Sequence, residues 1–392
     1  MNKVLYPMSV PASGELVLTN ARVVTAEAEF DGTVVLRGDE IVEVSDRPSG
    51  LSGAVDFEGD HLLPGLVELH TDNLERHVSP RPGVTWPPAH AILAHDAEVA
   101  AAGITTVLDA LRLGTLRESG DFVRGARDLA GTINALQADG LTRAEHLLHL
   151  RCEVSCDGVA GDLGRFIGDP LLRLVSVMDH TPGQRQFADL EKYKEYYGGK
   201  YGFTDEELQR YLDQALAAQA RNSAPNRRRI VELCALNGIS LASHDDACRE
   251  HVEEALDDGV VIAEFPTTEE AAAAAGKAGL HILMGAPNVM RGGSHSGNVS
   301  ALELAQNGRL DILSSDYVPA SLLQSAFRLA EQVGGIALPA AIATVSRNPA
   351  RAVGLDDRGE IAVGQRADLL RVRRTPQAAV VREVWRAGRR VG

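Results

Sequence analysis

Hydrophobic and polar positions divide the chain into a long central part and two shorter ends. Between roughly residues 63 and 354, short apolar runs alternate with alanine-rich helical stretches such as 91–103 and 269–279. Eight of the apolar runs are predicted to be strands: 66–70, 105–111, 147–155, 171–179, 239–245, 260–266, 280–286 and 311–317. Repeated strand–helix units with continuous apolar strands predict a parallel α/β sheet that is buried on both faces. Eight such units favour closure into a TIM-type (β/α)8 barrel.

An open, doubly wound parallel sheet is the main alternative to a barrel. Such a sheet is expected to carry a glycine-rich phosphate-binding turn after its first strand. Here the first predicted strand ends in His-Thr-Asp at positions 70–72. The barrel is therefore the favoured architecture.

The two ends of the chain follow a different pattern. Residues 15–44 contain short β-rich runs separated by Asn, Asp and Gly, and a related pattern returns at 358–388. Neither end has enough strands for a domain of its own. We expect residues 1–62 and 355–392 to combine into one small β-sandwich, with residues 63–354 forming the inserted barrel domain.

The composition of the chain argues against several classes of binding partner. The chain has 392 residues and a net charge of -15, which argues against nucleic acid or anionic membranes as partners. Four cysteines are too few for a disulfide scaffold, and no apolar stretch approaches the length of a membrane span. The sequence therefore predicts a cytoplasmic protein that has no membrane partner, and a homodimer is the expected assembly.

Ionisable side chains stand at the carboxyl ends of several predicted strands, where barrel enzymes gather their catalytic residues. They are His70, Asp72, Glu153, His180, His244 and Asp316. Imidazole and carboxylate together are ligands of zinc and similar divalent ions. Taken singly these residues have simpler explanations, since Asp316 could cap a helix and Glu153 could pair with Arg151. As a set they predict a metal site at the mouth of the barrel.

Two segments carry a family resemblance. LLPGLVELHTDNLE at 62–75 and GEIAVGQRADLLRV at 359–372 resemble the metal-binding opening and the closing return of the amidohydrolase superfamily. The resemblance implies that one or two divalent ions bind, with zinc expected and manganese or iron as alternatives. It also implies that Asp316 binds metal and accepts the proton of the attacking water, and that His180 and His244 are ligands. Glu153 stands where the superfamily has a carboxylated lysine or a glutamate, and such a carboxylate could bridge two ions.

The sequence departs from the superfamily pattern in two places. Asp72 stands where a second histidine is usual, and our strand count places His180 and His244 after the fourth and fifth strands, where the superfamily uses the fifth and sixth. Glu264 and His281 are the substitute ligands if one of these assignments fails.

Four longer segments, 70–87, 177–187, 284–301 and 314–323, are similar to the phosphonate-operon branch of the superfamily. This branch consists of alpha-D-ribose 1-methylphosphonate 5-triphosphate diphosphatases. The resemblance implies a small anionic substrate, a sugar triphosphate, which is hydrolysed with release of pyrophosphate.

Several loop residues could bind such an anion, because glycine-rich backbone and arginine side chains suit phosphate. The candidates are His77, Arg185, Arg291, Gly292, Gly293 and His295. His90 and His95 are expected to be surface or core residues. The long connection after His180, from about Gln184 to Asn226, is expected to cover the site.

Two other functions remain open at this stage. One is a cyclic-amide hydrolase or deaminase with the same metal site, since fold alone does not determine substrate. The other is an inactive amidohydrolase-fold scaffold protein, against which the complete set of candidate ligands argues.

Overall fold

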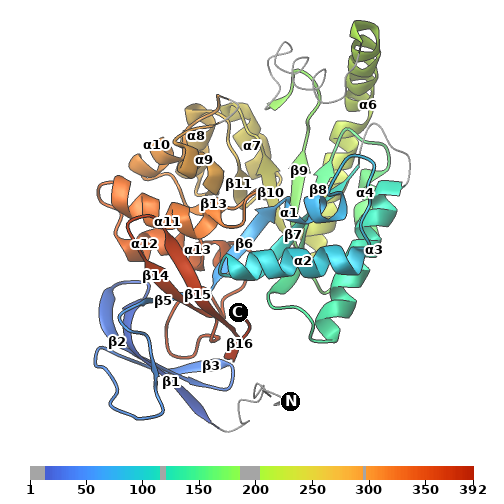
Figure 1. Cartoon of the computed structure of the whole chain (residues 1–392). Coiled ribbons are helices and arrows are strands. Elements are labelled where there is room, and N and C mark those ends of the chain that lie inside the picture. Colours follow the sequence, from blue (N-terminus) through green and yellow to red (C-terminus); the bar gives the residue numbers. More distant parts are fainter. Residues whose placement is uncertain (1–13, 115–120, 186–203, 295–296) are drawn as a thin grey trace.

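A computed structural model describes residues 14–114, 121–185, 204–294 and 297–392. Its central feature is a sheet of eight parallel strands in the order β13-β12-β11-β10-β9-β8-β7-β6 (Figure 1). The strands are β6 (Leu66–Thr71), β7 (Ile104–Leu113), β8 (Glu145–Glu153), β9 (Leu172–Met178), β10 (Ser240–His244), β11 (Ile262–Glu264), β12 (His281–Gly285) and β13 (Ile312–Ser314). Each of them lies at a predicted strand, so the predicted count of eight is confirmed.

The first and last strands of this sheet meet just beyond β13. The Asp72 N–H donates to the Asp316 carbonyl over 2.7 Å, and the Asp316 N–H donates to the His70 carbonyl over 3.2 Å. A parallel bridge between Thr71 and Asp316 completes the contact. The predicted barrel is thus confirmed, and its closure places the chain after β13 directly beside the end of β6. The rim formed by the carboxyl ends of β6–β13 is called the barrel mouth below.

Helices pack around the barrel strands and cover the outer face of the sheet (Figure 1). Their amphipathic or alanine-rich sequences bury one side against the strands, as the burial of Ala271, Ala272 and Ala275 in α8 illustrates. The helices are α1 (Asn73–Val78), α2 (Pro88–Ala101), α3 (Asp121–Ala138), α4 (Val159–Gly164), α6 (Asp205–Asn237), α7 (Arg249–Asp257), α8 (Glu269–Ala278), α9 (Ala286–Arg291), α10 (Ala301–Gln306), α11 (Ser321–Gln332), α12 (Leu338–Ala343) and α13 (Arg347–Ala352). Within the described ranges, no helix is both long and apolar enough to cross a membrane.

The two ends of the chain build one mixed sheet, called the terminal sheet, as expected. Its strands are β1 (Glu15–Val24), β2 (Glu29–Arg37), β3 (Glu40–Ser45), β4 (Val55–Asp56), β5 (His61–Pro64), β14 (Leu369–Arg374), β15 (Ala379–Arg386) and β16 (Arg389–Arg390). The junction is the antiparallel pairing of β5 with β14, where Leu63 faces Leu370. Phe57 and Trp385 stack at 5.9 Å in a core separate from that of the barrel. Figure 1 shows the blue and red strands of the terminal sheet side by side.

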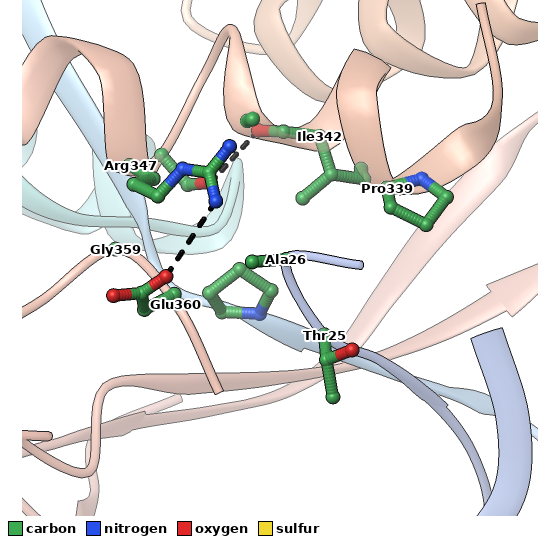
Figure 2. Close-up of a pocket in the computed structure, with 10 residues that line it drawn as sticks. Thr25, Ala26, Pro339, Ile342, Arg347, Gly359 and Glu360 are labelled. Carbon is green, nitrogen blue, oxygen red and sulfur yellow. Dashed lines mark hydrogen bonds and ion pairs between the residues drawn. The ribbon is translucent and has the colours of Figure 1, made fainter. Parts of the chain in front are cut away.

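A small pocket lies where the terminal sheet meets α12 and α13 (Figure 2). Thr25 and Ala26 line one side of it and Ile342 lines another, while Arg347 and Glu360 form an ion pair of 3.7 Å at its edge. None of the strand-end residues lines this pocket. It is a packing gap between two units of the fold, and the candidate chemistry lies at the barrel mouth.

Candidate metal centre

Three histidines from three strand ends converge at the barrel mouth. His70 is the next-to-last residue of β6, His180 follows β9, and His244 is the last residue of β10. The rings of His70 and His244 are stacked with centroids 5.8 Å apart, and the rings of His180 and His244 meet edge to face at 5.4 Å. The three histidines that were predicted as ligands from their positions at strand ends therefore lie close together.

A carboxylate fixes the orientation of each ring through its Nδ1 atom. Glu264, at the end of β11, accepts from Nδ1 of His70 over 2.7 Å and from Nδ1 of His244 over 2.8 Å. Glu153 accepts from Nδ1 of His180 over 2.6 Å. Metal-binding histidines in proteins almost always donate their second ring nitrogen in this way, which fixes the tautomer and leaves the other nitrogen for the ion.

The Nε2 atoms of the same rings face aspartates at distances that suit a shared ion. Nε2 of His180 and Nε2 of His244 lie 3.7 and 3.5 Å from Oδ2 of Asp245, and Nε2 of His70 lies 3.8 Å from Oδ1 of Asp72. These distances exceed those of well-formed N–H···O hydrogen bonds, roughly 2.7–3.2 Å. Two donors at about 2.0–2.2 Å from one zinc ion are roughly 3.4 Å apart in tetrahedral geometry.

The donor set also fits a divalent cation electrostatically. Burial lowers the pKa of His70, but the charge and hydrogen bond of Glu264 together with the charge of Asp72 outweigh this effect, so the net pKa is raised. Burial raises the pKa of Glu264, yet its interactions with the surrounding histidines, that with His70 first, hold the net pKa well below its usual range. Buried, ionised carboxylates are stabilised by positive charge nearby, and a divalent ion would supply that charge.

The backbone at three of the strand ends is in an unusual conformation. Asp245, Phe265 and Asp316 have φ values of 57°, 54° and 54°, in the left-handed region that residues other than glycine seldom adopt. Each stands one or two residues beyond a barrel strand. Such conformations cost of order 1–3 kcal/mol each and gather at functional sites. Here they turn the side chains of Asp245 and Asp316 back over the barrel mouth.

Asp316 lies near both His70 and His244. It is largely buried and interacts electrostatically with His70, Asp72 and His244. Burial, reinforced by the negative charge of Asp72, raises the pKa of its carboxyl group. A raised pKa makes the carboxylate a stronger base toward a water molecule bound beside it.

The layer below the histidines is hydrogen-bonded and desolvated. Nδ1 of His149 donates to the Leu69 carbonyl over 2.9 Å, and Nε2 of His149 contacts Ser176 Oγ at 2.5 Å. The Ser176 hydroxyl donates to Glu264 over 2.8 Å. Burial lowers the pKa of His149 to about 3, so this ring is neutral. The floor of the site therefore supports Glu264 and adds no charge of its own.

Comparison with known proteins identifies the family. The model of the amidohydrolase family matches residues 85–391. The chain is also 49% identical over 377 residues to the alpha-D-ribose 1-methylphosphonate 5-triphosphate diphosphatase of Escherichia coli (strain K12), covering 96% of this chain and 100% of that protein. The chain belongs to the amidohydrolase family. This confirms the resemblance inferred from residues 62–75 and 359–372.

Solved structures of amidohydrolases and related enzymes share the fold. The N-acetylglucosamine-6-phosphate deacetylase from Pasteurella multocida superposes with a TM-score of 0.63 at 14% identity, covering 96% of this chain and 99% of that chain. A D-hydantoinase superposes with a TM-score of 0.56 at 16% identity, covering 96% of this chain and 95% of that chain. At these identities the likeness concerns the barrel and its terminal sheet alone.

Within this amidohydrolase, two predicted ligands have positions that the sequence did not indicate. Asp72 forms an ion pair with Arg151, an arginine that we had considered as a partner of Glu153. Both oxygens of Glu153 are engaged by His180, through its backbone N–H at 3.0 Å and its ring at 2.6 Å. The Glu153 carboxylate therefore faces the Nδ1 side of His180, opposite to the side where His180 faces Asp245.

Sequence reasoning did not select Asp245 and ranked Glu264 only as a substitute. The available signal was that both lie at predicted strand ends, at 239–245 and 260–266. His281, the other substitute, begins β12 and therefore lies at the end of the strand opposite to the barrel mouth. The structure also places eight strands in the barrel, so His180 and His244 do follow the fourth and fifth strands.

The predicted anion-binding residues are dispersed. The guanidinium of Arg185 is buried and paired with Asp246 and Glu254. The N–H groups of Gly292 and Gly293 donate to carbonyls of the last turn of α9, and Arg291 is exposed at the end of that helix. Nε2 of His77 contacts Glu98 at 2.9 Å. His295 lies outside the described residues, as does the part of the expected covering segment from 186 to 203.

A second group of buried histidines and carboxylates lies outside the barrel wall, between α2, β7 and β8. It comprises His95, Asp96, Asp109 and His146 and is called the outer cluster below. Asp109 contacts Nε2 of His95 and Nδ1 of His146, each at 2.8 Å. Nε2 of His146 lies 3.3 Å from Asp96. His95 is thus a core residue and His90 is exposed, as expected.

Proposed function

We propose that this amidohydrolase hydrolyses a sugar triphosphate, alpha-D-ribose 1-methylphosphonate 5-triphosphate, between its α and β phosphorus atoms and releases pyrophosphate. The observation that carries the metal-dependent chemistry is the convergence of His70, His180 and His244, whose Nε2 atoms face Asp72 or Asp245 at 3.5–3.8 Å. The substrate assignment is supported by the 49% identity to the E. coli diphosphatase over nearly the whole of both chains.

The metal would be held by the three histidine Nε2 atoms together with Asp72, Asp245 and Asp316. His180, His244 and Asp245 offer donor atoms within 4.8 Å of one another, and His70 with Asp72 lies on the other side of His244. This arrangement accommodates one or two ions. When bound, such an ion lowers the pKa of water and polarises a phosphoryl oxygen. We expect zinc, with manganese or iron as alternatives.

Side chains of the protein would orient the metal ligands and accept the proton of the attacking water. Glu264 and Glu153 hold the three imidazoles in the tautomer that presents Nε2 to the ion. Asp316, with its raised pKa, accepts the proton of the attacking water. The left-handed backbone at Asp316 keeps this carboxylate over the barrel mouth. The cytoplasmic location and the homodimer remain predictions.

The test is product analysis with the metal-loaded enzyme. We expect the ribosyl triphosphate to yield pyrophosphate, which phosphorus NMR distinguishes from inorganic phosphate, and water labelled with heavy oxygen shows which phosphorus is attacked. Dihydroorotate, hydantoin and N-acyl amino acids are assayed in parallel. Turnover of a ring amide without pyrophosphate release would contradict the substrate assignment, and a metal-loaded enzyme inert on all substrates would indicate a scaffold protein.

A further inference from the structure

Two arginines line the wall of the barrel mouth between strands that lead to metal-binding histidines. Arg112 on β7 and Arg151 on β8 are register partners. In the sheet, β7 and β8 stand between β6 and β9. Register partners on neighbouring strands project to the same face, and residues two apart on one strand do so as well. His149 and Glu153, on either side of Arg151, both contact residues of the barrel interior. Both arginines therefore point into the barrel mouth.

The two guanidinium groups differ in what they contact. Arg151 is 6% exposed and forms an ion pair with Asp72. Burial lowers its pKa, but the charge of Asp72 together with those of other nearby carboxylates outweighs this and raises it. Arg112 is only partly buried, and its Nε atom, like that of Arg151, is buried without a hydrogen-bond partner. Among the described residues no carboxylate forms an ion pair with Arg112. Leaving a donor of this kind unsatisfied is costly, so an acceptor from outside the chain is expected.

The electrostatic surroundings place Arg112 beside the metal centre. Burial raises the pKa of Asp72, but Arg151, His70 and Arg112 outweigh it and the net pKa is lowered. Burial likewise raises the pKa of Glu153, and His180 together with Arg112 lowers it overall. The charge of Arg112 thus reaches both carboxylates that flank it, although it forms no ion pair with either.

The cations that the sequence suggested for the substrate are engaged elsewhere. The guanidinium of Arg185 is buried against Asp246 and Glu254, and Arg291 is exposed at the carboxyl end of α9, where the helix dipole disfavours an anion. Of these arginines and the pair on β7 and β8, Arg112 alone lies in the wall of the mouth without an ion-pair partner.

We propose that Arg112 binds a phosphoryl group of the substrate and selects polyphosphate over uncharged substrates, while Arg151 positions Asp72 beside it. A guanidinium fork can donate two parallel N–H···O bonds to one phosphoryl group, which gives geometric as well as electrostatic selection. The proposal rests on the proposed triphosphatase function and adds the residue that recognises the anion.

The test compares Arg112→Gln and Arg112→Lys with a control, Arg386→Gln. Arg386 is a partly buried arginine outside the barrel mouth whose guanidinium donates to the carbonyls of Thr142 and Ala144. Losing a charge-assisted hydrogen bond is expected to raise the KM for the ribosyl triphosphate by about 10- to 100-fold in Arg112→Gln. The inhibition constant of pyrophosphate should rise in parallel, with bound metal unchanged. Arg112→Lys, which keeps the charge without the fork, should show a smaller increase.

Each outcome decides between the alternatives. If Arg112 only balances the charge of the carboxylates, Arg112→Gln will lose metal while its metal-loaded fraction keeps the wild-type KM, and the proposal is overturned. Wild-type pyrophosphate release together with an unchanged KM in both Arg112 variants would overturn it as well. Failure of the wild type to cleave any triphosphate would instead refute the proposed function. If Arg112→Gln does not fold, Arg112→Lys gives the same comparison of KM with metal content.

Discussion

The metal centre and the outer cluster contain the same residue types, are both buried, and yet differ in what their histidines face. In the outer cluster, ring nitrogens of His146 reach Asp109 and Asp96 at 2.8 and 3.3 Å, and Nδ1 of His95 meets Asn73 at 2.9 Å. Asp96 also accepts backbone N–H groups and pairs with Arg143. Every ring nitrogen of this cluster therefore has a protein partner at hydrogen-bonding distance, although His95, Asp109 and His146 also offer ligand atoms within 4.8 Å of one another.

At the barrel mouth the two nitrogens of each ring lie at different distances from the neighbouring carboxylates. Nδ1 atoms contact Glu264 or Glu153 at 2.6–2.8 Å, whereas Nε2 atoms stand 3.5–3.8 Å from aspartates. The comparison shows that a set of histidines and carboxylates does not identify a metal site by itself. The distinguishing feature is the spacing: Nε2 of His70, His180 and His244 lies 3.5–3.8 Å from Asp72 or Asp245, which suits an ion and is too long for a good hydrogen bond.

The largest expected difference between the two clusters is in metal content. His244→Asn should remove an Nε2 donor that both halves of the centre share, so bound metal and turnover are expected to be lost. His146→Asn should leave the metal content of the folded protein unchanged. Elemental analysis of both purified variants, with and without chelator treatment, measures this. Equal metal loss in the two variants would mean that the outer cluster binds the ion.

The next largest effect is expected at Asp316. Asp316→Asn keeps the size of the side chain but removes the proton acceptor, so turnover should fall by about 10²–10⁴-fold. Because the three histidines remain, most of the metal should stay bound. Steady-state kinetics and elemental analysis on one preparation check both parts. Near-normal turnover would show that another group accepts the proton.

A smaller effect is expected from the carboxylate that orients two histidines. Glu264→Gln should lower metal affinity or activity by about 10–100-fold, as for other residues that hold a ligand without touching the ion. Asp109→Asn is the matched variant, because Asp109 also contacts two histidines. It should lower the free energy of unfolding by about 3–5 kcal/mol, because it leaves buried charge uncompensated. Its metal affinity should stay unchanged. The comparison fails if Asp109→Asn weakens metal binding as much as Glu264→Gln does.

The fold was predictable because it depends on local patterns. Continuous apolar runs marked all eight barrel strands, and the strand-end rule located His70, His180, His244 and Asp316. What local sequence does not encode is the direction of each ring. His70 and Glu264 are 194 residues apart, and their hydrogen bond decides which nitrogen of the histidine faces the mouth.

The anion-binding residues were harder to predict for a related reason. Arg185 follows His180 closely, which suggested a place at the mouth, but Asp246 and Glu254 compete for its charge. Arg112 directly follows the predicted strand at 105–111, and nothing in its local sequence singled it out. Only its position opposite Arg151 in the register of the neighbouring strands β7 and β8 reveals that it points into the barrel. Side-chain competition across the fold, and not the motif, determines which arginine can meet a substrate.

The smallest expected effect separates the two clusters by pH. Burial lowers the pKa of His146, but Asp109 and Asp96 outweigh it and raise the pKa from its ordinary 6.5 to about 9. Because the folded pKa exceeds the unfolded one, the stabilisation from this charged ring is fully present below pH 6.5 and is lost as pH rises through about 9. The melting temperature of the metal-loaded wild type should therefore fall between pH 6.5 and 9. His146→Gln should be less stable at pH 6.5, and its deficit should shrink by pH 9. His90→Gln, which removes an exposed histidine of the same helix as His95, should follow the wild type throughout. Calorimetric scans across this range measure the three curves, and parallel curves for the wild type and His146→Gln would show that the ring is neutral in the fold.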